Sequence, residues 1–260
     1  MSRFMERAGG RLHYRIDGNE QAPWLTLSNS LGTDLGMWEP QMVALQKHFR
    51  VLRYDTRGHG RSALPPSPCT IGELAQDVVD LLDHVGVAQT HFCGLSLGGM
   101  TGMALATRFP ERVARLALCN TSSFMGPASA WDTRIALVRE GGTAAVTEAV
   151  IGRWFTPGFQ TAAPGKIAVV RKMLLNTSAA GYAACCAAIR DMDQRESIKA
   201  IGNVTLVIVG THDPATPPQD GKLIAQAIAG AKLVELDAAH LSNWEQVEAF
   251  TQNLADFLLQ

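Results

Sequence analysis

The chain contains 260 residues, with 23 lysines and arginines against 24 aspartates and glutamates. This nearly neutral balance, without a basic stripe, excludes the usual kind of nucleic-acid-binding protein. Hydrophobic residues make up 47% of the chain and charged residues 18%, which excludes a disordered protein and indicates a globular one. A chain of this length forms one large or two small domains.

The five cysteines are scattered, at positions 69, 93, 119, 185 and 186. They form no C-x-x-C pair and have no histidine at metal-ligand spacing, so we expect neither a disulfide framework nor a zinc site. We expect reduced, mostly buried thiols, as is typical of a cytoplasmic protein. The polar amino-terminal residues do not resemble a signal peptide, and no apolar run reaches the ~18 residues of a membrane helix. We therefore expect a soluble cytoplasmic protein without a membrane partner.

Apolar runs with strand character recur along the chain. The first residues, 4–14, contain Gly9 and Gly10 and predict an antiparallel hairpin at one edge of a sheet. Six later runs are each followed by turn residues, which is typical of buried parallel strands. These runs cover residues 24–27, 51–54, 91–93, 113–119, 205–209 and 232–236.

Helical patterns lie between these strands. From Ile71 to Val85, apolar residues recur at helical spacing, and Thr70 with Glu73 is expected to cap the start of this helix. Another helix is expected over residues 98–109, before Pro110 ends it. Alternating strands and helices predict a parallel sheet with helices on both faces.

The alternation breaks between residues 122 and 193, where only helical patterns occur. Four helices are predicted there, over residues 127–140, 143–154, 163–176 and 179–192. We interpret this stretch as a lid over the carboxyl edge of the sheet, where such folds bind ligands. The chain then divides into a core of residues 1–121 and 194–260 and a lid of residues 122–193. Seven basic and five acidic residues give the lid a charge of +2, against −3 for the core.

The strongest local motif is Gly94-Leu95-Ser96-Leu97-Gly98, between a predicted strand and a predicted helix. A G-x-S-x-G turn in this context holds its serine in a strained conformation, with the hydroxyl exposed above the sheet. Glycines are required because side chains would clash in so sharp a turn. The helix that follows adds N–H groups and a positive dipole for a developing oxyanion. Ser96 is therefore predicted to be a nucleophile.

A serine nucleophile needs a base, and the base needs an orienting acid. In chains with this motif the acid follows the serine and the histidine comes last. Asp213 and His240 each follow one of the last two predicted strands, so both are expected at the same edge of the sheet as Ser96. His212 as the base and Asp237 as the acid are less favoured alternatives, because His212 adjoins Asp213 and Asp237 is typical of a turn. We predict a triad of Ser96, Asp213 and His240.

An oxyanion hole requires two N–H donors. One is expected from Leu97, directly after the nucleophile, and the other from Leu31, in the loop after the strand at 24–27. His59 lies in the glycine-rich segment at 55–62, Asp-Thr-Arg-Gly-His-Gly-Arg-Ser, and is expected to make structural hydrogen bonds there. This chemistry requires no metal and no organic cofactor.

The chain resembles the α/β-hydrolase family over essentially its whole length. The resemblance rests on the D-x-R-G-H-G-x-S segment, the nucleophile motif, the late aspartate and histidine, and the helical cap. It implies an α/β-hydrolase fold, with a mostly parallel eight-stranded sheet flanked by helices and an all-helical lid. Two further segments are similar to the 3-oxoadipate enol-lactonases within this family: Asn-Ser-Leu-Gly-Thr-Asp at 29–34 with Met37-Trp38, and Gly-Leu-Ser-Leu-Gly-Gly-Met at 94–100. Many α/β-hydrolases carry His-Gly where this chain has Asn29-Ser30.

The closer resemblance implies a carboxylic-ester hydrolase of the β-ketoadipate pathway, which breaks down aromatic acids. The reaction would be hydrolysis of 3-oxoadipate enol-lactone, a small anionic substrate, through an acyl-enzyme. Two alternatives remain open at this point. One is a carboxylesterase or carbon–carbon bond hydrolase of the same fold, and the other is a ligand receptor that keeps the triad. No pattern in the sequence indicates an oligomeric state.

An anionic substrate calls for a cation in the lid. Arg134 lies on the same helix face as Trp131, Ile135 and Val138. An arginine on such a face either extends its charge to water at the edge or pairs with a substrate carboxylate, and the positive charge of the lid favours the second role. Trp131 and Trp154 are expected either to line the substrate pocket or to pack between lid helices.

Overall fold

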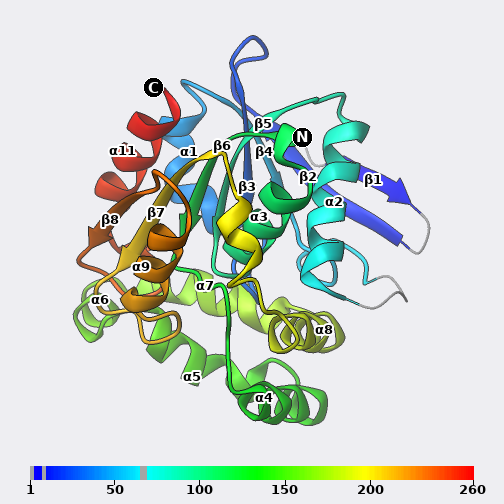
Figure 1. Cartoon of the computed structure of the whole chain (residues 1–260). Coiled ribbons are helices and arrows are strands. Elements are labelled where there is room, and N and C mark those ends of the chain that lie inside the picture. The colour runs from blue at the N-terminus through cyan, green and yellow to red at the C-terminus, as the bar shows by residue number, and fades with distance from the viewer. Residues whose placement is uncertain (1–2, 8–9, 65–68) are drawn as a thin grey trace.

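The computed structural model describes residues 3–7, 10–64 and 69–260, and its strands form one eight-stranded sheet (Figure 1). The strand order is β1-β2-β4-β3-β5-β6-β7-β8. The expected hairpin consists of β1 (Arg3–Arg7) and β2 (Gly10–Asp17), which pair antiparallel at one edge. Of the residues used in the sequence predictions, Met1, Ser2 and Gly9 lie outside the described residues.

The other strands run parallel to one another and lie within two residues of the predicted limits. They are β3 (Trp24–Ser28), β4 (Arg50–Tyr54), β5 (Thr90–Leu95), β6 (Val113–Cys119), β7 (Val204–Gly210) and β8 (Lys232–Leu236). The strands from β3 to β7 are buried along most of their length, which accounts for their continuous apolar runs. Because these strands are parallel, the loops after them meet at one edge of the sheet.

Helices cover both faces of the sheet (Figure 1). One face carries α2 (Ile71–His84), α3 (Leu97–Arg108) and α9 (Pro218–Ala227), and the other carries α1 (Glu39–Leu45) and α11 (Val247–Leu258). The predicted cap of α2 is present, since the Glu73 N–H donates to Thr70 Oγ1 at 3.1 Å. Four short helices complete the core: η1 (Leu35–Trp38), η2 (Pro110–Arg112), η3 (Ser197–Ala200) and α10 (Ser242–Glu245).

Apolar side chains fill the space between the sheet and both helical layers. Trp38 and Phe250 pack ring against ring on the face of α1 and α11, with their centroids 6.1 Å apart. Phe92 of β5 lies on the face of α3, where Gly102 leaves room for its ring. All three aromatic side chains are fully buried. This packing holds the strand ends, and the loops that follow them, in fixed positions.

Residues 122–193 carry five helices that gather beyond the carboxyl edge of the sheet (Figure 1). They are α4 (Ala128–Gly141), α5 (Ala144–Trp154), α6 (Pro157–Ala162), α7 (Pro164–Asn176) and α8 (Ala179–Arg190). Four of them match predicted helices. The fifth, α6, was not predicted, because six residues are too few to display a helical period.

The two ends of this helical segment lie side by side. Phe124 forms an isolated antiparallel bridge with Asp193, and the Gln194 N–H donates to the Ser123 carbonyl at 2.8 Å. The segment therefore leaves and re-enters the core at one place. The strands before and after it, β6 and β7, remain neighbours in the sheet.

Four of the five cysteines are buried, as expected, and Cys69 is half-buried. The sulfur atoms of Cys69 and Cys185 are 3.7 Å apart, and those of Cys93 and Cys119 are 3.8 Å apart. Over the described part of the chain, every helix is too short or too polar to cross a membrane.

Candidate active site

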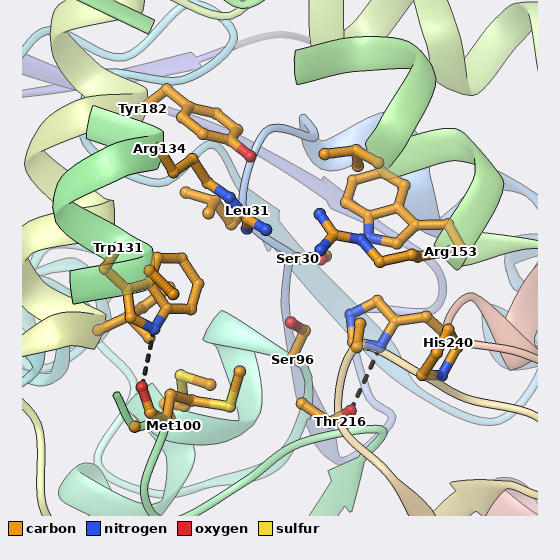
Figure 2. A pocket seen from close by; sticks show the side chains of 18 residues that line it. Ser30, Leu31, Ser96, Met100, Trp131, Arg134, Arg153, Tyr182, Thr216 and His240 are labelled. Carbon is orange, nitrogen blue, oxygen red and sulfur yellow. Dashed lines mark hydrogen bonds between the residues drawn. The ribbon is translucent and has the colours of Figure 1, made fainter. Parts of the chain in front are cut away.

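Ser96 forms the sharp turn between β5 and α3, with φ 58° and ψ −115°. A positive φ costs a non-glycine residue roughly 1–3 kcal/mol, so its surroundings must hold the turn. The Ser96 N–H donates to the Cys119 carbonyl at 2.9 Å, and the Ser96 carbonyl accepts from Thr121 Oγ1 at 2.7 Å. These contacts with the end of β6 fix the turn and leave the Ser96 hydroxyl facing a cavity (Figure 2).

The two glycines of the motif allow this turn to form. A Cβ at Gly94 would collide with the carbonyl of Gly98, and a Cβ at Gly98 would collide with the carbonyl of Ser28 in β3. Both obstacles are backbone atoms, which cannot move without displacing α3 or the sheet. The requirement for glycine, expected from the sharpness of the turn, is confirmed.

Gly98→Ala is expected to lower the free energy of unfolding by at least about 2 kcal/mol, because the added methyl group overpacks against backbone. Urea denaturation of the two proteins measures this difference. Gly165→Ala is the matched control, since a Cβ at Gly165 would meet no atom within 4 Å. A Gly98→Ala protein that unfolds at the wild-type urea concentration would contradict the packing described for the turn.

Asp213 and His240 meet on neighbouring loops, after β7 and β8. His240 Nδ1 lies 2.8 Å from Asp213 Oδ2, and both residues are buried. Burial alone raises the pKa of Asp213, but the charge of His240 and hydrogen bonds from His240, Asn120 and Thr216 outweigh it and hold this pKa below its ordinary value. Asp213 is therefore an ionised acceptor for the Nδ1 proton, which leaves Nε2 of His240 to act as a base.

Thr216 contacts both Asp213 and His240 and helps to hold them in place. Its Oγ1 donates to Asp213 Oδ2 at 2.8 Å and lies 3.3 Å from His240 Nδ1 (Figure 2). The N–H groups of Ala215 and Thr216 donate to Asp213 Oδ1 at 2.8 and 3.1 Å. Sequence reasoning missed Thr216, although an aspartate that accepts from the residues two and three positions later is a common local pattern.

The structure brings the predicted triad residues together. Ser96 and His240 both line one cavity of about 180 Å³ (Figure 2), and Asp213 lies against Nδ1 of His240. The alternatives, His212 and Asp237, pair with each other instead, with His212 Nε2 2.7 Å from Asp237 Oδ1. Their side chains are 59% and 84% exposed, outside the lining of this cavity.

The two expected oxyanion donors lie at the same edge. Leu97 is the first residue of α3, so its N–H has no acceptor within the helix. In the loop after β3, the Ser30 N–H donates to Met37 Sδ at 3.4 Å and the Thr33 N–H donates to the Ser30 carbonyl at 3.2 Å. The Leu31 N–H between them donates to no acceptor in the described protein, and Leu31 lines the cavity.

Trp131 and Trp154 line the side of the cavity formed by the helical segment. Trp131 Nε1 donates to the Met125 carbonyl at 2.8 Å (Figure 2). The Trp154 ring stacks on the His240 ring, with their centroids 6.1 Å apart and an interplanar angle of 29°. The Trp154 carbonyl also accepts from the Leu241 N–H at 3.0 Å. Both tryptophans therefore lie at the wall of the cavity, which is one of the two arrangements expected of them.

Two guanidinium groups point into the cavity, from Arg134 on α4 and Arg153 on α5 (Figure 2). Arg134 Cζ lies 4.7 Å from the centroid of the Trp131 ring. Among the described residues, no carboxylate lies within 4.0 Å of either guanidinium. Burial lowers the pKa of Arg153 from its ordinary value, and the charge of Arg134 lowers it further. Two neighbouring cations without a counter-ion attract an anionic ligand to this end of the cavity.

Arg153 was not among the predicted site residues, although the sequence contains a signal for it. Arg153 follows Val150 by three positions on the buried face of α5, next to Trp154. The same spacing separates Arg134 from Trp131 on α4. Both arginines can be predicted from the sequence as basic residues that share a helix face with apolar residues.

The glycine-rich segment at 55–62 supports the core next to the site. Asp55 Oδ2 accepts from the Arg61 N–H at 2.8 Å and lies 2.7 Å from His13 Nδ1. His59 is buried, with Nδ1 3.1 Å from the Arg57 carbonyl. Burial lowers the pKa of His59, which keeps its ring neutral. His59 therefore makes the kind of structural hydrogen bond that was expected of it.

Comparison with known proteins places the chain in a family. A family model described as "alpha/beta hydrolase fold" matches residues 23–146, and one described as "TAP-like protein" matches residues 172–260. The 3-oxoadipate enol-lactonase 2 of Acinetobacter baylyi is 43% identical over 239 residues, which cover 92% of this chain and 90% of that protein. The chain belongs to the α/β-hydrolase family.

Two further relatives cover nearly the whole chain. The 3-oxoadipate enol-lactonase 1 of Acinetobacter baylyi is 37% identical, over 97% of this chain and 94% of that protein. The crystal structure of the enol-lactonase from Burkholderia xenovorans superimposes with a TM-score of 0.97 at 49% identity, over 99% of this chain and 100% of that one. The expected α/β-hydrolase fold, with its mostly parallel eight-stranded sheet, is confirmed.

Proposed function

We propose that this α/β-hydrolase opens 3-oxoadipate enol-lactone by hydrolysis, in the breakdown of aromatic acids. One observation carries the proposal: a small cavity is lined at one end by a serine and by a histidine that is paired with an aspartate, and at the other by two guanidinium groups without a carboxylate. The carboxylate of the lactone supplies the missing counter-ion. Relatives named 3-oxoadipate enol-lactonase, at 43% and 37% identity, support the same substrate.

In this proposal Ser96, His240 and Asp213 are the catalytic residues. Ser96 Oγ attacks the lactone carbonyl while His240 Nε2 takes the hydroxyl proton, and Asp213 stabilises the resulting imidazolium. The N–H groups of Leu31 and Leu97 donate to the oxyanion of the tetrahedral intermediate. Collapse breaks the bond between the acyl carbon and the ring oxygen. His240 protonates that oxygen, which leaves as an enol and becomes the 3-oxo group.

Ring opening releases no fragment, so the acyl-enzyme retains the whole substrate. Water then attacks the ester carbonyl of Ser96, with His240 again removing a proton, and 3-oxoadipate leaves. Neither step uses a metal or an organic cofactor. Residues 122–193 act as the lid over residues 1–121 and 194–260, and they exclude bulk water from the reacting groups. The same proposal places the enzyme in the cytoplasm, where its cysteines stay reduced.

The lid also sets the orientation of the substrate. Arg134 and Arg153 bind the carboxylate, because a guanidinium matches a carboxylate with two parallel hydrogen bonds. Trp131 and Trp154 form apolar walls around the lactone ring. The cavity, at about 180 Å³, is smaller than the roughly 300–1,000 Å³ of sites for drug-sized ligands, so a small substrate fits it.

Arg134→Ala and Arg153→Ala are each expected to lower kcat/KM for the enol-lactone about 10- to 100-fold, mainly through KM, because each removes a hydrogen bond between charged groups. A neutral aryl ester should be hydrolysed at close to the wild-type rate. Steady-state kinetics with both substrates measures the difference. Arg171→Ala is the control within the lid, since Arg171 pairs with Glu148 at 2.8 Å outside the cavity. Equal losses on both substrates would assign Arg134 and Arg153 a structural role.

A comparison of three substrates tests the class of reaction. The substrates are the enol-lactone, p-nitrophenyl acetate and a vinylogous diketo acid of the kind that ring cleavage produces. Hydrolysis of the enol-lactone is followed by the loss of its ultraviolet absorbance. The enol-lactone is expected to show the highest kcat/KM. A preference for the aryl ester or the diketo acid would replace the proposal with a carboxylesterase or a carbon–carbon bond hydrolase. Ligand binding without turnover of any substrate would indicate a receptor.

A further inference from the structure

Two non-glycine residues in the described parts of the chain have a positive φ, Ser96 at 58° and Asn120 at 43°. They stand at the ends of the neighbouring strands β5 and β6. A left-handed backbone is costly for most residues and persists where the surrounding structure imposes it, often at functional sites. The nucleophile turn accounts for Ser96. Asn120 needs a separate explanation.

Hydrogen bonds occupy the whole side-chain amide of Asn120, which is 1% exposed. Asn120 Nδ2 donates to Asp213 Oδ2 at 3.1 Å and to the Ala239 carbonyl at 3.2 Å. Asn120 Oδ1 accepts from Ser242 Oγ at 2.6 Å. Asp213 follows β7, Ala239 directly precedes His240, and Ser242 begins α10. One amide thus connects the acid, the loop of the base and the helix after that loop.

The chemistry of these partners requires an amide. The Asp213 carboxylate and the Ala239 carbonyl can only accept, so both need the NH₂ group, while the Ser242 hydroxyl can donate to the amide oxygen. An aspartate at 120 would set one carboxylate against another. The left-handed backbone aims the short side chain at these partners, and asparagine tolerates that conformation better than most residues.

We propose that Asn120 is a positioning residue, whose amide holds the Asp213 carboxylate and the His240 loop in fixed positions relative to each other. The inference rests on the proposed function, because it presumes that Asp213 and His240 are catalytic. Asn120 is absent from the cavity lining, so a substrate bound in the cavity would not contact it. It acts through Asp213 and through the loop that carries His240.

The electrostatic surroundings of Asp213 predict how a change at Asn120 alters catalysis. The titratable groups that face Asp213 are His240, from the loop after β8, and Asp220, from α9. Burial, and to a lesser degree the charge of Asp213, raise the pKa of Asp220. A carboxylate at position 120 would remove a donor from Asp213 and add negative charge near His240, which favours the imidazolium form. Because the imidazolium cannot accept the serine proton, activity would be lost at a higher pH than in the wild type.

The test measures kcat/KM against pH, from about pH 5 to about pH 9, across the titration of histidine. The substrate is p-nitrophenyl acetate, which reports on the triad whatever the natural substrate is. Asn120→Asp keeps a residue that accepts the left-handed backbone. It is expected to move the acid limb of the profile, where kcat/KM falls as the pH decreases, upward by about one pH unit. It is also expected to lower kcat/KM at least about tenfold at neutral pH. If kcat/KM of this variant falls on the acid side at the same pH as in the wild type, the proposal is wrong.

Asn203→Ala is the matched control for loss of a structural asparagine. Asn203 Nδ2 donates to the carbonyls of Pro110 and Val113 at 3.0 and 2.7 Å, at the opposite edge of the sheet from the site. This variant is expected to lower Tm without moving the acid limb. The same upward shift in Asn203→Ala would show that general loosening of the fold causes it, which would also overturn the proposal.

Asn120→Ser keeps the test decisive if the aspartate variant does not fold. Serine removes the amide without adding charge, and kcat is expected to fall at least about tenfold with little change in KM. A wild-type kcat would overturn the positioning role. Failure of the proposed triad is recognised separately, because Asp213→Asn would then hydrolyse the same ester at the wild-type rate.

Discussion

Ser96→Ala is expected to lower kcat for the enol-lactone by about six orders of magnitude, the scale seen when a serine nucleophile is removed from a triad. The remaining groups still bind the substrate and polarise its carbonyl, but no hydroxyl is present to form the acyl-enzyme. The fold should be retained, because the contacts that fix the turn involve the backbone N–H and carbonyl of Ser96.

Two measurements check this expectation. Steady-state assays give the loss of activity, and intact-mass spectrometry after exposure to an organophosphonate should show a covalent adduct on the wild type and none on the variant. Ser129→Ala, at an exposed position on α4, is the control and should keep wild-type activity and labelling. Residual activity above about 1% of wild type would rule out Ser96 as the nucleophile.

Asp213→Asn is expected to lower kcat about 10⁴-fold with little change in the fold. The carboxylate accepts the Nδ1 proton of His240 and stabilises the imidazolium, whereas an amide can turn its NH₂ group toward Nδ1 and favour the wrong tautomer. The comparison variant is Asp237→Asn, which changes the exposed partner of His212 and should leave kcat unchanged. A larger loss in Asp237→Asn than in Asp213→Asn would reverse the assignment of the acid.

The lowered pKa of Asp213 also predicts a pH dependence of stability. A carboxyl group whose pKa is lower in the folded protein than in the unfolded chain stabilises the fold at pH values above its unfolded pKa. For Asp213 this contribution is present above pH 3.8 and is lost as the pH falls toward the lower value of the folded state. Urea denaturation should show that Asp213→Asn loses less stability than the wild type over this acidic range.

Sequence patterns predicted most of the core because strands and long helices carry local periodic signals. The turn at Ser96 was predicted in the same way, since five consecutive residues specify it. Asp213 and His240 could be predicted because each directly follows a strand, and parallel strands bring their carboxyl ends to one edge. Leu31 was placed by the same reasoning, and the structure sets it in the cavity lining.

The residues that were missed depend on contacts between distant segments. Asn120 lies 93 positions from Asp213 and 122 from Ser242, and no local sequence pattern predicts these hydrogen bonds. Arg153 could have been found by its helical face, but its proximity to Arg134 depends on how α4 and α5 pack. The sequence therefore predicted the proposed reacting groups better than the groups that are proposed to position them and the substrate.

The most direct test of the account compares the enol-lactone with its own carboxylate methyl ester, using the wild-type protein. The two molecules share the reacting ring, and the methyl group of the ester removes the negative charge that Arg134 and Arg153 are proposed to bind. The account predicts a kcat/KM for the enol-lactone of at least about 10⁴ M⁻¹s⁻¹, and a value roughly 100-fold lower for the methyl ester. Equal values for both, or no turnover of the enol-lactone, would contradict it.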